Sequence, residues 1–157
     1  MATIIEAPHL FPSDNLIHSY TIFLAGSIEN GTAENWQNKL SNILNNFDHI
    51  IVLNPRRKHW DKELDGKKLR TQIVWERNGL RKSDLVIFYF DPTTKSPISL
   101  CELGENLAQG KKCIVYCPPT FYRYTNVEVL CSDYGIIPHS DYEVFVANIV
   151  SHISRFA

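Results

Sequence analysis

The sequence of 157 residues lacks long apolar runs and concentrated charge. No apolar run approaches the roughly 18 residues that a membrane-spanning helix requires. Acidic and basic residues nearly balance, with a formal net charge of −1, and neither sign forms a tail. Binding to nucleic acid or to an anionic membrane surface depends on concentrated positive charge. We therefore expect neither of these partners.

Cysteine is scarce, and the spacing of metal ligands is missing. The four cysteines form no C-x-x-C pair, and the six histidines show no zinc-like spacing, so we assign no metal. The first 15 residues lack the basic stretch and long apolar run of a secretory signal. Free thiols without a leader are typical of a reducing compartment, so we expect a cytoplasmic protein.

Three glycine motifs are also absent. The chain has no G-x-G-x-x-G, no G-x-x-x-x-G-K-[ST] and no G-x-S-x-G. These turns hold a dinucleotide, hold the phosphates of a nucleoside triphosphate, or present a nucleophilic serine. Their absence disfavours all three kinds of site. The remaining candidates for catalytic residues are carboxylates.

What the sequence does contain is an alternation of short apolar runs with helical segments. The runs predicted as strands are 20–25, 50–53, 85–90 and 113–117, with weaker candidates at 3–5 and 135–137. The predicted helices are 33–47, 69–82, 96–109, 125–131 and 142–156. This alternation favours right-handed βαβ units and a doubly wound sheet of about five parallel strands.

The length fits a single domain over residues 1–157, with 1–19 as a lead-in arm. In parallel sheets of this kind, ligands bind beyond the carboxyl ends of the strands. The loops 26–31, 54–60, 91–97 and 118–124 should therefore meet at one edge.

Glu76 is one candidate at that edge. Leu69, Ile73, Glu76 and Leu80 share a face of the predicted helix, which would turn Glu76 inward. One interpretation is a polar group aimed into a cavity beside Gln72 and Trp75. The other is a boundary residue paired with an arginine at position 70, 77 or 81.

Glu102 is the second candidate, and its role depends on where its helix begins. If Ser96 is the N-cap and Pro97 the first helical residue, Glu102 lies in the second turn. If Ser99 is the N-cap, Glu102 only completes an S-x-x-E capping box. Gly104 costs the helix about 1 kcal/mol relative to alanine, which suggests that some group approaches closely there.

The loops offer further candidates, each with a plain alternative. Gly26 and Ser27 precede a helix, which suits an anion or is an ordinary turn. Arg56 and Arg57 could clamp a phosphate or form a solvated loop. Three aromatic residues could line a slot for a base or belong to the core: Trp60, Trp75 and Tyr89.

Five segments, in this order, resemble the nucleoside 2-deoxyribosyltransferase superfamily, especially its deoxyribosyltransferase-like branch. They are FLAGSI at 23–28, LNPRR at 53–57 with Trp60, QIVWE at 72–76, SDLVIF at 83–88 and SPISLCELG at 96–104. The resemblance spans about residues 20–117, and the E-L-G after a strand and loop is its most specific part.

The resemblance implies a flavodoxin-like sheet and a homo-oligomer whose subunits share the active site. It implies cleavage of the N-glycosidic bond of a 2′-deoxynucleoside and transfer of the deoxyribosyl group to another nucleobase, with no cofactor. It makes Glu102 the nucleophile and Glu76 the acid of the preceding helix. Gly26 and Ser27 match the ligand-binding loop, and Asn126 matches a side chain from a neighbouring subunit.

One position departs from the family pattern. Ser96 stands six residues before the nucleophile, where an aspartate is expected, and Asp91 is a possible substitute. Related hydrolases contact a 5′-phosphate through similar serines, which leaves a deoxynucleoside 5′-monophosphate hydrolase open, as well as a nucleotide sensor or a hydrolase of NAD-like N-glycosides. The full set of expected substrate contacts is Gly26, Ser27, Asn54, Arg56, Gln72, Trp75, Asp91, Ser96, Ser99 and Asn126.

Overall fold

The computed structural model describes residues 1–11, 19–58 and 65–156. Within these ranges, a five-stranded parallel sheet has the order β1-β3-β2-β4-β5. Its strands are β1 (Thr3–Glu6), β2 (Tyr20–Gly26), β3 (Ile50–Asn54), β4 (Leu85–Tyr89) and β5 (Lys112–Tyr116). The α-helices are α1 (Trp36–Leu44), α2 (Gly66–Lys82), α3 (Pro97–Ala108), α4 (Tyr124–Asp133) and α5 (Tyr142–Ile153), with a 3-10 turn, η2, at Glu29–Gly31. The predicted flavodoxin-like, doubly wound fold is confirmed.

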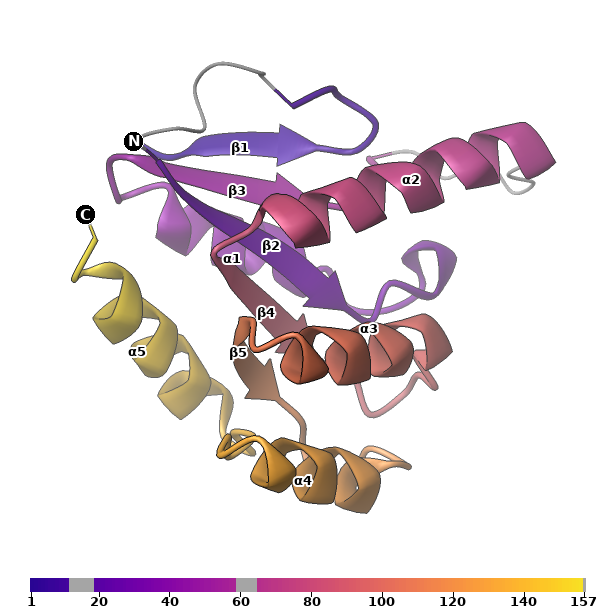
Figure 1. Cartoon of the computed structure of the whole chain (residues 1–157), viewed down its shortest axis with the longest axis vertical. Helices are drawn as coiled ribbons and strands as arrows, with labels where there is room; N and C mark the ends of the chain where they lie inside the picture. Colours follow the sequence, from indigo (N-terminus) through magenta and orange to yellow (C-terminus); the bar gives the residue numbers. More distant parts are fainter. Residues whose placement is uncertain (12–18, 59–64, 157) are drawn as a thin grey trace.

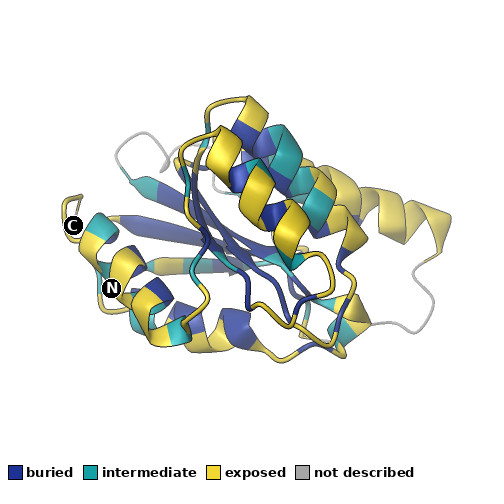
Figure 2. Ribbon diagram, turned by 90° about the horizontal axis from the view of Figure 1, so that it is seen from below, coloured by how far each residue is buried: buried dark blue, intermediate teal, exposed yellow. Residues whose placement is uncertain are grey.

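Helices cover both faces of the sheet (Figure 1). Successive side chains of a strand point to opposite faces. Phe23 and Ala25 of β2 accordingly pack in a core with residues of α2, α3 and α4, whereas Ile22 and Leu24 pack with α1 and α5. Figure 2 shows the resulting pattern, with buried strands between helices that are exposed on their outer sides. No helix in the described ranges is long and apolar enough to cross a bilayer.

The fifth strand is β1, and the predicted strand at 135–137 is wrong. Gly135 has φ 71° in the turn after α4, and Ile137 is 84% exposed. Pro138 follows and has no N–H for a ladder. A single bridge between Tyr116 and His139 lies beside β5 instead. The lead-in arm supplies the missing strand, because β1 pairs in parallel with β3.

The predicted inward face of α2 is also partly wrong. Leu69 and Ile73 are 44% and 45% exposed, and the buried residues are Gln72, Trp75, Gly79 and Leu80. The helix begins at Gly66, where the Asp65 side chain accepts from the N–H of Lys68. Its first turns extend past the sheet (Figures 1 and 2), so residues there have no core to enter.

The strand order places the topological switch point of the sheet at the carboxyl ends of β2 and β4. After β2 the chain forms β3 on one side and then crosses to form β4 on the other, which is the switch point where ligands bind in such sheets. Gly26 ends β2 with φ 135°, and a Cβ there would lie 2.2 Å from the carbonyl oxygen of Tyr89. Only glycine fits at this point, and its missing side chain allows the end of β2 to approach the backbone of β4 closely.

Candidate active site

Glu102 lies in the second turn of α3, as the first alternative for its helix predicted. The helix begins at Pro97, and Ser96 occupies the N-cap position. The N–H of Leu100 already donates to the carbonyl oxygen of Ser96 at 3.1 Å. Ser99 is thus inside the helix, and Glu102 does not form a capping box with it.

The Glu102 carboxylate has no structural task in the described part of the chain. It is partly buried, and no described residue forms a hydrogen bond with it. Burial, and secondly the negative charge of Glu76, raise the pKa of Glu102 to about 8, against the opposing charge of Arg77. A carboxylate without partners in a desolvated place is typical of catalytic sites.

Glu76 lies on α2 within electrostatic range of Glu102. Its Oε1 accepts from the amide nitrogen of Gln72 at 2.9 Å. Burial raises the pKa of Glu76, while the Gln72 hydrogen bond and the charge of Arg57 oppose this. Among the described residues Glu76 forms no ion pair, so the boundary interpretation is not supported.

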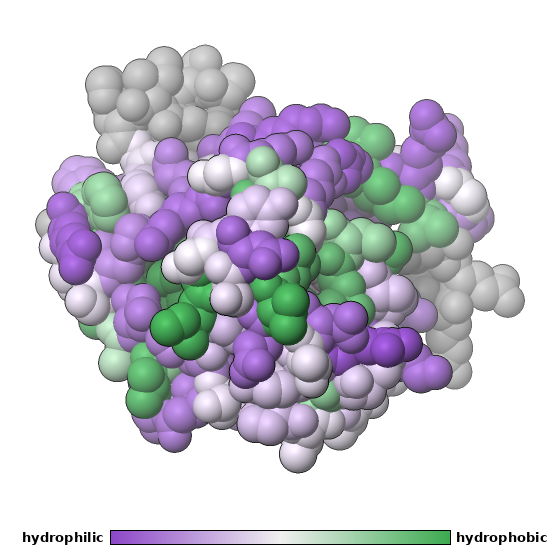
Figure 3. Space-filling view, turned by 60° about the horizontal axis from the view of Figure 1, so that its bottom comes forward, coloured by the Kyte–Doolittle hydropathy of each residue, from purple (hydrophilic) through white to green (hydrophobic). Residues whose placement is uncertain are grey.

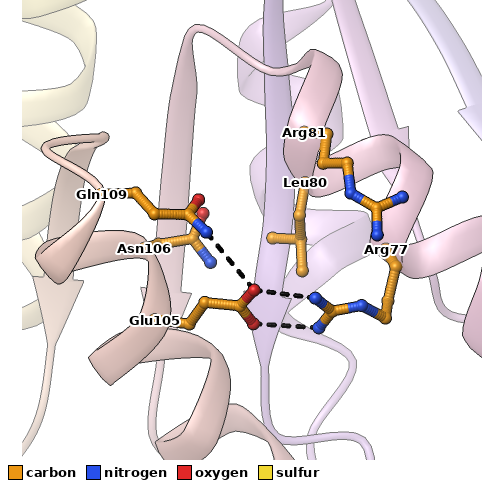
Figure 4. A pocket seen from close by; sticks show the side chains of 6 residues that line it. All are labelled: Arg77, Leu80, Arg81, Glu105, Asn106 and Gln109. Carbon is orange, nitrogen blue, oxygen red and sulfur yellow. Dashed lines mark hydrogen bonds and ion pairs between the residues drawn. The ribbon is translucent and has the colours of Figure 1, made fainter.

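Two of the arginines of α2, Arg77 and Arg81, bind residues other than Glu76. Arg77 forms a fork with the carboxylate of Glu105, at 2.7 and 2.9 Å (Figure 4). Arg81 donates to Oδ1 of Asn78 at 3.1 Å. The recess beside this fork has a volume of about 10 Å³, which is room for one water molecule rather than a substrate. The fork joins α2 to α3 and so helps to set Glu76 relative to Glu102.

Three buried hydroxyls form one hydrogen-bonded cluster next to the carboxyl end of β2. Ser27 Oγ lies 2.6 Å from Ser96 Oγ and 2.9 Å from Thr94 Oγ1, and the last two are 2.8 Å apart. Ser27 also accepts from the N–H of Asp91 at 2.9 Å. The cluster joins the loop after β2 to the loop before α3, which is why distant parts of the sequence meet here.

Unusual backbone geometry gathers in the same two loops. Glu29, Asn30 and Ser96 have φ between 48° and 53°, in a region that side chains other than glycine rarely adopt. The Glu29 carboxylate accepts from the N–H of Ser96 at 2.8 Å, which ties these loops together. Such strain persists only where surrounding contacts impose it, and it is common at active sites.

Arg56 braces a loop instead of presenting its guanidinium to a ligand. Its terminal nitrogens donate to the carbonyl oxygens of Gly31, Ala33 and Glu34 at 2.8 to 3.0 Å. A buried guanidinium needs such partners. The neighbouring Arg57 takes the opposite direction and donates through Nε to Gln72 at 2.7 Å, and no other described residue bonds its terminal nitrogens.

Asn54 and Asp91 also support loops. Asn54 Oδ1 accepts from the N–H of Arg56 at 3.0 Å. Asp91 Oδ1 accepts from the N–H and hydroxyl of Thr93, and its Oδ2 accepts from the N–H of Glu34. Although burial acts to raise it, these hydrogen bonds keep the pKa of Asp91 below its usual value. Both oxygens of Asp91 and the Oδ1 of Asn54 are therefore engaged with loop residues.

The predicted aromatic slot is absent from the described residues. Trp75 donates to the carbonyl oxygen of His9 at 2.7 Å and packs against Phe11 and Phe23. Tyr89 stacks between Trp36 and Tyr116. Both residues thus belong to the core, while Trp60 lies outside the described residues.

Ser99 and Asn126 differ in their relation to Glu102. Ser99 is buried one turn before Glu102, and its hydroxyl has no partner among the described residues. Asn126 is exposed on α4 and lines a groove of about 300 Å³ with Leu100. Leu100 and Glu102 point about 200° apart around α3, so this groove does not open onto Glu102.

Gly104 has no close neighbour that explains it. A Cβ at this position would meet nothing within 4 Å. The expectation of a close approach is therefore wrong for this chain taken alone.

Sequence reasoning did not identify Thr94 and Glu29, because a hydroxyl or carboxylate in a loop carries no local signal of its distant partner. Arg57 was noticed only as half of a basic pair.

Comparisons with known proteins agree with the fold and identify the family. A family model described as nucleoside 2-deoxyribosyltransferase-like matches residues 19–121. A crystal structure described as a conserved protein from Enterococcus faecalis V583 has the same fold, with a TM-score of 0.51 and 18% identity; the match covers 64% of this chain and 65% of that one. A search of curated proteins found no match. Among the described residues, no group of three or more potential ligands could hold a metal ion. The family match spans most of the chain and contains both carboxylates, so the protein belongs to the nucleoside 2-deoxyribosyltransferase-like family.

Proposed function

We propose that this protein cleaves the N-glycosidic bond of 2′-deoxynucleosides through a covalent intermediate on Glu102 and transfers the deoxyribosyl group to another nucleobase. One observation carries the proposal. Glu102 is a partly buried carboxylate with no hydrogen-bond partner among the described residues, beside a second carboxylate at the switch point of the sheet. The family match supports a nucleoside as the substrate.

The chemistry follows that of retaining glycosidases. The Glu102 carboxylate attacks C1′ through an oxocarbenium-like transition state and forms a glycosyl ester. A 2′-deoxy sugar favours this route, because it lacks the electron-withdrawing 2′-hydroxyl that would oppose positive charge at C1′. A second base, or water, then takes the sugar from the ester, and no metal or organic cofactor enters the reaction.

Glu76 handles the proton of the departing base. Two neighbouring carboxylates resist carrying two charges together, so one proton is held between them. Burial favours the proton on Glu102 in the free protein, whereas Gln72 and Arg57 favour the carboxylate of Glu76. The reactive form, with Glu102 ionised and Glu76 protonated, therefore requires this proton to move from Glu102 to Glu76 when the substrate binds. Glu102 then acts as the nucleophile while Glu76 is the acid, and the roles are separated by their positions on α3 and α2.

A 5′-monophosphate hydrolase is the second candidate, and one feature favours it. The N–H groups of Ile98 and Ser99, at the start of α3, have no partners among the described residues, and neither has the Ser99 hydroxyl. Such a helix start can bind a phosphate. This candidate shares the chemistry of Glu102 and differs in the substrate and the acceptor.

A second copy of the chain completes the site in this proposal. The first turns of α2 expose Leu69, Ile73 and Val74, and the start of α3 exposes Ile98. Figure 3 shows apolar side chains in separate patches on one face of the molecule. A homo-oligomer would cover apolar surface of this kind and could bring the partner's α4, with Asn126, towards Glu102. Exclusion of water by such a partner would favour transfer over hydrolysis.

The test is a base-exchange assay. We expect deoxyinosine and adenine to yield deoxyadenosine with the wild-type protein and not with Glu102→Ala. Free deoxyribose would indicate a hydrolase, and activity confined to deoxynucleoside monophosphates would favour the second candidate. No turnover of either substrate class or of NAD would favour a nucleotide sensor. Wild-type turnover by Glu102→Ala would contradict the covalent mechanism.

A further inference from the structure

Behind Glu76, an unbroken chain of hydrogen bonds runs from the end of β3 to α2. The Nε–H of Arg57 donates to Oε1 of Gln72 at 2.7 Å. The Gln72 amide nitrogen donates to the carbonyl oxygen of Pro55 at 3.0 Å and to Oε1 of Glu76 at 2.9 Å. Gln72 is only 3% exposed, so solvent does not readily replace these partners.

The chain of hydrogen bonds has only one possible direction. A guanidinium can only donate, and a carbonyl oxygen can only accept. Turning the Gln72 amide over would set its NH₂ group against the Nε–H of Arg57 and its oxygen against the oxygen of Pro55. The amide nitrogen must therefore face Glu76, and Oε1 of Glu76 must accept.

This direction decides which oxygen of Glu76 carries a proton. A carboxylic acid that accepts a hydrogen bond at Oε1 holds its proton on Oε2. Oε2 has no hydrogen-bond partner among the described residues. Among the described residues, the charge of Arg57, just after β3, acts on Glu76, and the charge of Glu76 acts in turn on Glu102 of α3. By reciprocity, an ionised Glu102 opposes the ionisation of Glu76. Arg57 favours the carboxylate, and Glu102, when ionised, favours the acid.

We propose that Arg57 and Gln72 are positioning residues that hold Glu76 with its proton on Oε2, available to the departing base. The inference rests on the proposed function of Glu76 and Glu102. As Glu102 bonds to C1′, the C1′–N bond breaks and its electron pair stays with the base, which takes the Oε2 proton on a nitrogen. Glu76 is left as a carboxylate stabilised by Arg57 and Gln72. An incoming base returns a proton to Oε2 as its nitrogen attacks C1′ and releases Glu102.

The test compares two leaving groups in Gln72→Met, which keeps the side-chain length and removes both hydrogen-bonding groups. Deoxyinosine needs a proton for its base to leave readily. N7-methyl-2′-deoxyguanosine already carries a positive charge on its base, which leaves as a neutral molecule. We expect kcat/KM to fall about 10- to 100-fold for deoxyinosine and less than about 3-fold for the methylated substrate.

Controls separate this role from a structural one. Gln109→Met changes an exposed glutamine at the C-cap of α3 and should alter neither rate. Arg57→Met should repeat the pattern of Gln72→Met, and it decides the question if melting curves show that Gln72→Met does not fold. Glu102→Ala should lose both activities.

Two outcomes would overturn the proposal, and they are distinguishable. Equal losses on both substrates in Gln72→Met and Arg57→Met would show that neither residue serves proton donation, while the chemistry of Glu102 would stand. A wild-type protein inactive on both substrates would overturn the proposed function and this inference with it.

Discussion

Replacing Glu102 with glutamine should make the protein more stable at neutral and alkaline pH while it abolishes turnover. Burial and the charge of Glu76 raise the pKa of Glu102 from 4.5 to about 8. The folded protein therefore binds this proton more tightly than the unfolded chain does. The sign follows from linkage: stability contributed by the proton is complete below pH 4.5 and is lost as pH rises towards 8. Glutamine does not titrate and avoids this loss.

The magnitude follows from the same pKa values. One pKa unit corresponds to about 1.4 kcal/mol, so wild-type stability should fall by up to about 3 kcal/mol between pH 4.5 and 7. Because Glu102 is only partly buried, we expect Glu102→Gln to gain about 2 kcal/mol relative to wild type across this interval. In a domain of this size that gain raises Tm by roughly 4–8 °C at pH 7.

The assay is urea unfolding of both proteins at pH 5, 7 and 8, together with base exchange. Glu105→Gln is a matched control one turn along α3, because its carboxylate is exposed and paired with Arg77. It should lose no more than about 1 kcal/mol and gain nothing at high pH. A uniform loss of stability for Glu102→Gln at every pH would refute the reasoning and make Glu102 a structural residue.

Three further predictions test the surroundings of Glu102. Glu76→Gln removes a charge that raises the pKa of Glu102, so the midpoint of Glu102 in an NMR titration should fall below about 8. Turnover should fall strongly while the protein stays folded. An unchanged midpoint would contradict the electrostatic coupling of the two carboxylates. Gly26→Ala sets a Cβ 2.2 Å from the Tyr89 carbonyl oxygen and should cost at least about 1–3 kcal/mol in urea unfolding, whereas Gly104→Ala, with open space around it, should not destabilise. Arg56→Met leaves buried carbonyl oxygens unpaired and should lower the free energy of unfolding by about 1–3 kcal/mol. It should not change the leaving-group preference, which we expect Arg57→Met to change. A changed preference in Arg56→Met would show that Arg56 acts on the substrate.

The strands, the helices and the family could be predicted from the sequence because each depends on local signals. A buried parallel strand is a continuous apolar run, which is why β2 to β5 were predicted within one or two residues. The last helix was predicted to begin at residue 142, and the structure confirms this start, where the Asp141 side chain accepts from the N–H of Val144. The ordered motifs carried Glu76 and Glu102, since both lie within short segments that match the family.

The remaining features depend on pairings across the chain, which local patterns do not contain. Arg56 and Arg57 are adjacent in sequence, yet one binds the loop at 31–34 and the other binds Gln72. The face of α2 was misjudged because its first turns extend past the sheet, where apolar periodicity does not imply burial. The weaker strand candidate at 3–5 is the edge strand β1, which forms because it pairs in parallel with β3.

The sequence by itself determined that Glu76 and Glu102 lie on two successive helices, which the structure confirms as α2 and α3. Only the tertiary structure decided that Glu102 has no capping role. It also decided that the Gln72 amide nitrogen donates a hydrogen bond to Oε1 of Glu76. The physical reason is that the neighbours which set the pKa of each carboxylate are distant in the sequence: Arg57 lies 19 positions before Glu76, and Glu76 lies 26 positions before Glu102.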